Sequence, residues 1–252
     1  MNASLRQFHD IVDGAYRKIL ETEEGSIDRA ADLLAGSIQR DELINVFGTG
    51  GHSSMGAMEM FWRAGALAAV RPILEPAVLP SGGAKHSNWI ERTEGFAPSV
   101  LSAYEVKAGE TMIIVNAYGI NSLTIDTALE CRKRGLRTIG VTSKSFAEKV
   151  PRGVAARHSS GLNLHEIVDV FVNNYMPYGD ACVRVDGFDQ ALAPVSTLVN
   201  CFCLHLIVIR TVEKLVAMGI EPPVWVSGNM PEGDAKNRRW HEKYDPRVKH
   251  LR

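Results

Sequence analysis

The sequence predicts an α/β fold: an αβα sandwich around a mainly parallel five-stranded sheet, preceded by an N-terminal pair of helices. Short apolar runs alternate with helical patterns over most of the chain, which is the arrangement of repeated βαβ units. Those runs are apolar without alternation, as in strands buried on both faces. The 252 residues are 45% apolar and 23% charged, which suffices for a globular protein with a sizeable core.

The first forty residues predict two helices. Residues 4–22 place apolar side chains at three- and four-residue spacing, which is typical of an amphipathic helix. Gly25 and Ser26 then interrupt the pattern, and Ser26 can cap a second helix that runs to about Gln39. We expect residues 1–40 to form a helical pair that packs on the following domain or exchanges between subunits.

The αβα domain is predicted to occupy residues 41–220. Its strands are expected at residues 43–48, 111–117, 137–143, 168–174 and 181–185. Helices are predicted at residues 54–68 and 121–135, and from Pro194 to Gly219. The last of these is apolar almost all round, so it is expected to be largely buried.

Residues 221–252 differ in composition from the rest of the chain. They are rich in proline, glycine and charged residues, which predicts a C-terminal surface tail or a segment that reaches over a neighbouring subunit. Trp225, Trp240 and Tyr244 would anchor this tail to another surface, because no basic groove accompanies them as in nucleic-acid binders.

Charge and cysteine usage exclude several protein classes. The 28 lysines and arginines against 29 acidic residues give no basic excess, so no nucleic-acid partner is expected. We expect no signal peptide at the N-terminus, and the longest apolar region, residues 198–209, is too short to cross a bilayer. Four cysteines without a spaced framework indicate a reducing compartment. We expect a cytoplasmic protein with no membrane partner.

The sequence predicts no cofactor. Gly48 and Gly50 satisfy two positions of the dinucleotide-binding fingerprint, but Ser53 occupies the third, and the Walker pattern is absent. Cys201 and His205 share a helix face, whereas Cys203 points about 200° away from Cys201. Two ligands make an incomplete zinc site, so helix packing is the expected role and no metal is predicted.

Polar, small residues follow three of the predicted strands. The segments are Gly48-Thr49-Gly50-Gly51-His52-Ser53-Ser54, Asn116-Ala117-Tyr118-Gly119-Ile120-Asn121-Ser122 and Thr142-Ser143-Lys144-Ser145. The carboxyl ends of parallel strands meet at one edge of a sheet, where helix N-termini and glycine amides favour oxygen-rich, anionic ligands. A tight turn with an N-cap serine explains one such loop equally well, but three of them together predict a pocket.

These segments resemble a sugar isomerase (SIS) domain. The resemblance rests on "NVFGTGGHSSMGAMEMFWRAG", on the turn ending in Gly119-x-Asn121 and on "VTS" after the next strand. Later segments, among them "RHSSGLNLHEIVDVFVNN" and "PVSTLVN", are similar to bacterial single-SIS proteins related to phosphoheptose isomerases, a long-uncharacterised UPF0309-like group. The resemblance implies a phosphosugar-binding αβα fold. It also implies that a partner subunit completes the sites, in a homodimer or homotetramer.

The second loop departs from the SIS pattern. SIS domains usually carry Ser-x-Ser-Gly-x-Thr/Asn there, and those serines hold a phosphate, whereas this chain has Asn116 and Tyr118 at the two positions. We expect the pocket to bind the oxygens of a carbohydrate. This carbohydrate would be phosphorylated, would carry another acidic group, or would be a non-phosphorylated sugar. The residues expected to do so are Gly50, Gly51, Ser53, Ser54, Asn116, Tyr118, Asn121, Ser122, Thr142 and Ser143.

Aldose–ketose isomerisation needs a base that moves a proton between C1 and C2 and an acid that opens the ring. The resemblance favours Glu59 as the base, although an ion pair with Arg63 at i+4 explains it equally well. His52 and His158 are the candidates for ring opening. His86 and the pair Glu91–Arg92, which matches close relatives, are further candidates.

Taken together, the residues and the resemblance predict a cytoplasmic sugar or sugar-phosphate isomerase. Two alternatives remain at this point: a non-catalytic sugar-phosphate sensor, and a sugar-phosphate lyase or etherase on the same fold. A DNA-binding regulator is disfavoured, because residues 1–40 contain no helix-turn-helix with a basic recognition helix.

Overall fold

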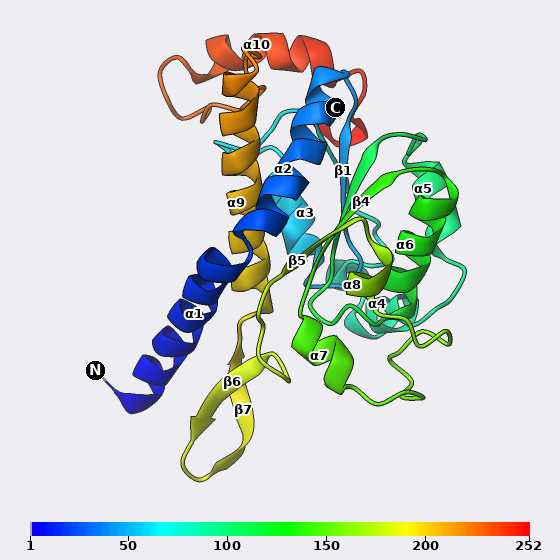
Figure 1. Ribbon diagram of the computed structural model, residues 1–252, viewed down its shortest axis with the longest axis vertical. Helices are drawn as coiled ribbons and strands as arrows, with labels where there is room; N and C mark the ends of the chain where they lie inside the picture. Colours follow the sequence, from blue (N-terminus) through cyan, green and yellow to red (C-terminus); the bar gives the residue numbers. More distant parts are fainter. Residues whose placement is uncertain (1) are drawn as a thin grey trace.

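A computed structural model describes residues 2–252 and shows ten α-helices and seven strands within them (Figure 1). The helices are α1 (Ala3–Thr22), α2 (Glu24–Gln39), α3 (Ser54–Met60), α4 (Ala84–Glu91), α5 (Ala97–Ala103), α6 (Ser122–Lys133), α7 (Lys144–Lys149), α8 (Leu164–Ile167), α9 (Ser196–Ala217) and α10 (Gly233–Tyr244). The strands are β1 (Ile44–Gly48), β2 (Val70–Ile73), β3 (Thr111–Val115), β4 (Arg137–Thr142), β5 (Val170–Asn173), β6 (Ala181–Val185) and β7 (Phe188–Pro194).

Five strands form one parallel sheet in the order β2-β1-β3-β4-β5. The chain runs outward from β1 to β2 and then returns to the other side of β1 with β3. The strand order therefore reverses between β1 and β3. In open parallel sheets, ligands bind in the crevice at the carboxyl ends of the strands at such a reversal. This topology singles out the loops after β1 and β3 as the place for a site.

Helices cover both faces of the sheet (Figure 1). Alternate residues of β1 point to opposite faces: Ile44 and Val46 pack with α2, α3 and α9, whereas Phe47 packs with α5 and α6. Both sets are fully buried, which explains why the strand sequences are apolar without alternation. The predicted αβα class with a parallel five-stranded sheet is confirmed.

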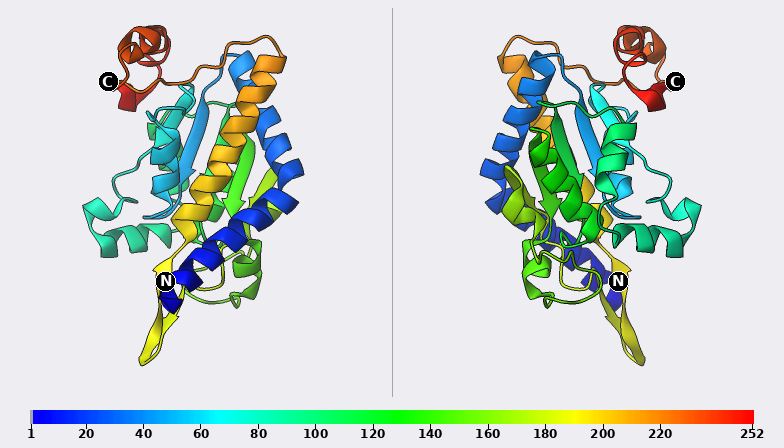
Figure 2. Two further views of the ribbon diagram at one scale, coloured as in Figure 1. Left: turned by 90° about the vertical axis from the view of Figure 1, so that its left-hand side faces the viewer. Right: turned by 90° about the vertical axis from the view of Figure 1, so that its right-hand side faces the viewer.

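One member of the sheet differs from the prediction. Residues 181–185 were expected to form the fifth strand, but this segment pairs only with β7 in an antiparallel hairpin that projects from the body (Figure 2). Its place is taken by β2, the segment "VRPI". Pro72 lacks a backbone donor and therefore obscures the strand signal, and β2 accommodates it because it lies at the edge of the sheet.

The helix after the first loop is also shorter than predicted. It was expected to extend over residues 54–68, but α3 ends at Met60. Phe61 is extended and Trp62 has a positive φ of 52°, so the chain leaves the helix there and turns toward β2. The Trp62 ring packs edge-to-face on Trp225, with centroids 4.7 Å apart, which offsets part of the cost of this backbone conformation.

The N-terminus and the C-terminus lie at opposite ends of the molecule (Figure 2). Helices α1 and α2 pack through Ile19 and Leu34, which are fully buried in the same core cluster as α9. Residues 221–252 were expected to form a surface tail that Trp225, Trp240 and Tyr244 anchor to another surface. In the structure Trp225 and Tyr244 are buried in that cluster, and Gly233–Tyr244 form the helix α10. Only the outer face of the tail is on the surface.

Candidate active site at the carboxyl edge of the sheet

A cavity of about 310 Å³ opens at the reversal point between β1 and β3. Its volume is at the lower end of the range for small-molecule sites, which suits a sugar. Most of its lining is polar or glycine, and it comes from the loops after β1 and β3, the end of α4 and the start of α9. The lining residues are Gly50, Gly51, His52, Ser53, Asn88, Glu91, Asn116, Ala117, Tyr118, Asp180, Pro194, Ser196 and Thr197.

The loop after β1 is closed tightly on itself. A side chain at Gly48 would place its Cβ 2.1 Å from the carbonyl oxygen of Ser53, so only glycine fits there. The Ser54 hydroxyl donates to the carbonyls of Gly48 (3.2 Å) and Gly50 (3.0 Å). Ser54 is fully engaged in this way and holds the loop in shape, whereas Ser53 lines the cavity.

The loop after β3 is held by Asn116, whose Oδ1 accepts from the backbone amides of Tyr118 (3.0 Å) and Gly119 (2.8 Å). Burial, followed by the charges of Asp180 and Glu91, raises the pKa of Tyr118, so its phenol stays protonated at neutral pH. Tyr118 lines the cavity and therefore offers it a hydroxyl donor.

Glu91, the last residue of α4, lies inside the cavity. Its Oε1 accepts from the backbone amide of Gly51 at 2.6 Å, and burial raises the pKa of its carboxyl group. A carboxylate thus already occupies a loop amide that a phosphate would use. This arrangement disfavours a second anion at the same place and favours the neutral hydroxyls of a sugar.

Glu59 lies outside this cavity, on the outer side of α3. Its Oε1 contacts the Arg63 Nε at 2.7 Å and the His205 Nε2 at 3.0 Å. The Glu59 side chain is 22% exposed and that of His205 is 52% exposed, so the imidazole–carboxylate pair is accessible to solvent. The predicted ion pair with Arg63 is present, and a histidine from α9 joins it.

The Glu59–His205 pair lies along the seam between α3 and α9, which leads away from the cavity. Met55 and Thr197 contact each other at the cavity end of this seam, with Sδ 3.9 Å from Oγ1. Glu59 follows Ser54 by five residues, which is about 7.5 Å along a helix. The pair therefore lies roughly one and a half helical turns from the cavity.

Other predicted residues have structural positions in this chain. The fully buried Ser143 donates to the Met176 carbonyl (2.9 Å) and caps α7, and the hydroxyl of the equally buried Thr142 donates to the Ala117 carbonyl at 3.5 Å. Neither lines the cavity, in contrast to the expectation that they bind substrate, because both face the packed interior behind the loops. His86 is exposed on α4 and also lies outside the cavity.

His158 is likewise separate from the cavity. It is buried, and its ring contacts the Asp126 carboxylate through Nε2 at 3.1 Å and the Ser160 hydroxyl through Nδ1 at 2.7 Å. Asn121 is buried beside it and donates to the Ala156 carbonyl at 3.0 Å. Arg92, Ser122 and His158 instead line a second cavity around the start of α6.

Two residues of this region, His205 and Asp180, were not predicted as part of a site from the sequence. His205 was assigned to helix packing, although its position on the same helix face as Cys201 and its polar character in an apolar helix were visible signals. Asp180 was not considered at all. It accepts from the amides of Val195 (2.9 Å) and Ser196 (2.7 Å), and so fixes the start of α9 at the cavity. No local sequence pattern connects Asp180 with Val195, fifteen positions later.

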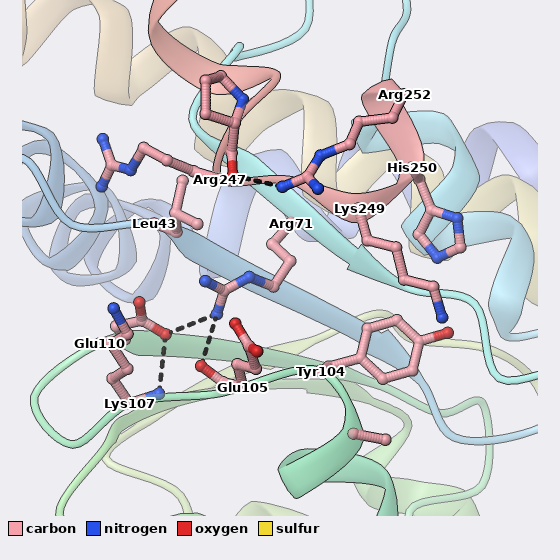
Figure 3. A pocket seen from close by; sticks show the side chains of 12 residues that line it. Leu43, Arg71, Tyr104, Glu105, Lys107, Glu110, Arg247, Lys249, His250 and Arg252 are labelled. Carbon is pink, nitrogen blue, oxygen red and sulfur yellow. Dashed lines mark hydrogen bonds and ion pairs between the residues drawn. The ribbon is translucent and has the colours of Figure 1, made fainter.

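A third cavity, of about 380 Å³, lies at the opposite, amino edge of the sheet beside the C-terminal segment (Figure 3). Arg71 is at its centre, and its Nη1 is 3.0 Å from both the Glu110 carboxylate and the Asn45 amide oxygen. This buried network is neutralised and joins β1, β2 and β3. We therefore interpret it as structural.

Among residues 2–252, no group of three or more His, Cys, Asp or Glu side chains could hold a metal ion. None of the helices in that range combines the length and apolarity needed to cross a membrane.

Known proteins match this chain over nearly its full length. A family model described as SIS domain matches residues 7–143. A UPF0309 protein of Thermoanaerobacter pseudethanolicus is 36% identical over 251 residues, covering 98% of this chain and all of the relative. A UPF0309 protein of Geobacillus thermodenitrificans is 33% identical over 242 residues, covering 96% of this chain and 95% of the relative.

Two solved structures share the fold. The phosphoheptose isomerase GmhA of Neisseria gonorrhoeae has a TM-score of 0.53 at 13% identity, covering 80% of this chain and 93% of that one. A phosphoheptose isomerase of Francisella tularensis has a TM-score of 0.53 at 12% identity, covering 84% of this chain and all of that one. With the parallel sheet, the Gly-rich loop at its reversal point and these matches, the chain belongs to the SIS domain family, among the UPF0309 proteins.

Proposed function

We propose that this protein is an aldose–ketose isomerase that acts on a sugar or an acidic sugar derivative. The observation that carries the proposal is the accessible Glu59–His205 pair, 3.0 Å apart, which lies outside the polyol-sized cavity at the far end of the seam between α3 and α9. The reaction needs one group that takes the C2 proton and returns it to C1, and one that supports the oxygen at which charge develops. A carboxylate and an imidazole suit these two tasks.

Glu59 is the base in this proposal. Both contacts of Glu59, to Arg63 and to His205, fall on Oε1, which leaves Oε2 for a substrate C–H group. Arg63 and His205 orient the carboxylate, and His205 can exchange a proton with a sugar oxygen. The pair needs no metal ion, since the enediol is handled by proton transfer alone.

The strand-end cavity holds the polyol in this proposal. Tyr118 and Ser53 offer hydroxyl groups, His52 offers a ring nitrogen, and Glu91 can accept from a sugar hydroxyl in addition to the Gly51 amide. Two observations support this role. Polar groups converge on the cavity of about 310 Å³, and the Gly51 amide, which could otherwise bind an anion, already donates to Glu91.

A second copy of the chain completes the site in this proposal, in a homodimer or homotetramer. Large apolar side chains are exposed along the α3–α9 surface around Glu59 and His205, among them Met58 (44%) and Ile209 (56%). A partner that covers them would also exclude water from the pair. We expect Met58→Asp/Ile209→Asp to reduce the molar mass measured by light scattering to that of one chain. An unchanged mass would contradict this assembly.

The activity is tested by exchange with solvent. The purified protein is incubated with free, phosphorylated and acidic aldoses and ketoses in deuterated water, and loss of the C2 proton signal is followed by NMR. The proposal predicts enzyme-dependent exchange and interconversion for at least one sugar. Thermal stabilisation by a sugar without any exchange would overturn the isomerase and favour the non-catalytic sensor.

A further inference from the structure

The cavity at the amino edge of the sheet (Figure 3) is separate from the candidate active site, which lies at the opposite end of β1 and β3. Its volume of about 380 Å³ is within the range of small-molecule sites. Its walls come from the starts of β1, β2 and β3, from the end of α5 and from residues 246–252, which include the short 3₁₀ helix η2 (Lys249–Leu251). Segments that are far apart in the sequence thus meet around one space.

Arg71 lies at the centre of this cavity and is 7% exposed. All of its hydrogen bonds come from Nη1, which donates to Asn45 (3.0 Å), to Glu110 (3.0 Å) and to the Glu105 carbonyl (3.4 Å). Its Nε and Nη2 have no acceptor among residues 2–252, and neither is sealed from solvent. One side of the guanidinium group therefore serves the structural network, and the other side presents N–H groups to the cavity.

The charge of the lining is positive. Lys107, Lys249 and Arg252 line the cavity and form no ion pair with any residue from 2 to 252. Within the same range, Glu105 is the one acidic side chain of the lining without a cationic partner, since the other carboxylate is paired with Arg71. Three unpaired cations against one unpaired carboxylate give the cavity a potential that attracts anions.

The positive groups lie on more than one side of the cavity. In the view of Figure 3, Lys107 and Lys249 are on opposite sides of Arg71. Lys249 extends over the Tyr104 ring, with Nζ 5.6 Å from the ring centroid. Burial, followed by the charge of Glu75, raises the pKa of Tyr104 to about 12, so its phenol keeps its proton at neutral pH and can donate. A ligand with a single charged group would reach only one of these cations.

We propose that this cavity binds a small oxyanion with two or more acidic groups, one of which contacts Arg71 while another reaches Lys107 or Lys249. The planar fork of an arginine matches the oxygens of phosphoryl and carboxylate groups, which share this chemistry. Hydrogen bonds to the free side of Arg71 are strengthened by its burial. Because Lys249 belongs to η2, the bound ligand also links residues 246–252 to the sheet.

Inorganic pyrophosphate is the first probe. Isothermal titration in a zwitterionic buffer, with ionic strength held constant by sodium chloride, should show one saturable site. Lys107→Gln and Lys249→Gln each remove one exposed cation and should weaken binding about tenfold or more, as expected for loss of a charged hydrogen bond. Lys85→Gln, on the exposed side of α4 near the strand-end cavity, makes the same charge change and should leave the affinity unaltered. Arg71 is not varied, because its loss would also disrupt the buried network.

Hydrogen exchange gives the location independently. Bound pyrophosphate should slow the exchange of backbone amides in residues 246–252, and Lys249→Gln should reduce this effect. Unchanged exchange in that segment at saturating pyrophosphate would overturn the proposal. So would weakening of binding in Lys85→Gln equal to that in Lys249→Gln, since the ligand would then occupy the other edge of the sheet.

Citrate and orthophosphate distinguish the chemistry of the ligand. Tighter binding of pyrophosphate than of citrate indicates phosphoryl groups, and tighter binding of citrate indicates carboxylates; both results support the site. Orthophosphate carries one acidic group and should bind about tenfold more weakly than pyrophosphate, as expected for the loss of one charged contact. Equal affinity for the two phosphates, or no saturable binding of pyrophosphate and citrate, would overturn the proposal. The result does not depend on C2 proton exchange, so this proposal and the isomerase proposal fail separately.

Discussion

The hydrogen bond between Glu91 and the Gly51 amide is predicted to hold the glycine-rich loop in place. Two substitutions separate the hydrogen bond from the charge: Glu91→Gln keeps an acceptor of the same shape, whereas Glu91→Ala leaves the amide without a partner. An orphaned buried amide costs about 1–3 kcal/mol. The bond is 2.6 Å long and burial raises the pKa of the carboxyl group, and we take the middle of that range for it.

We therefore expect Glu91→Ala to be less stable than Glu91→Gln by about 2 kcal/mol. For a chain of this size, that difference lowers the melting temperature by about 4–8 °C. Thermal unfolding of both variants, followed by circular dichroism at the same pH, measures it. Melting temperatures within one degree of each other would show that the bond does not hold the loop.

The charge of Glu91 adds a pH dependence to the wild-type protein. Because burial raises the pKa of the folded-state carboxyl group, the folded protein binds its proton more tightly than the unfolded chain does. The contribution of Glu91 to stability is therefore present at low pH and decreases as the pH rises from the unfolded pKa through the folded one. Each tenfold difference in proton affinity corresponds to about 1.4 kcal/mol. Glu91→Gln should lack this decrease, and parallel pH profiles of the two proteins would refute the reasoning.

Two further predictions concern the frame of the site. Gly48→Ala should destabilise the fold by about 3 kcal/mol or more, because its Cβ would lie 2.1 Å from the Ser53 carbonyl, whereas Gly14→Ala, with open space around it, serves as control. Urea unfolding measures both, and equal stabilities would contradict the loop geometry. Arg71→Met should cost about 3–5 kcal/mol, because Glu110 is left buried without its partner. Arg71→Met/Glu110→Leu should restore most of that loss, and a double variant as unstable as the single one would contradict this explanation.

The sequence was sufficient to predict the parallel sheet and the two loops at its reversal point. Both follow from local signals: apolar runs of strand length, and glycines where the backbone folds on itself, as at Gly48. The edge strand β2 escaped prediction because Pro72 weakens a four-residue pattern, and β6 was misassigned because a hairpin strand has the same local pattern as a sheet strand.

The candidate site depends more strongly on tertiary contacts. Glu91 enters the cavity only because α4 ends against the first loop, forty residues away, and His205 reaches Glu59 across 146 residues. Neither contact has a sequence pattern of its own. Thr142 and Ser143 follow a strand as expected, yet they face the interior, since the direction of a hydroxyl after a strand is set by the packing behind it.

The isomerase proposal is tested most directly by comparing C2 proton exchange in Glu59→Gln and Glu91→Gln with the wild-type protein. Loss of a general base typically lowers the rate about 10²–10⁴-fold. We predict a loss of that size in Glu59→Gln with sugar binding retained, and a much smaller change in Glu91→Gln. Full exchange in Glu59→Gln, or a loss confined to Glu91→Gln, would contradict the assignment of the base to the Glu59–His205 pair.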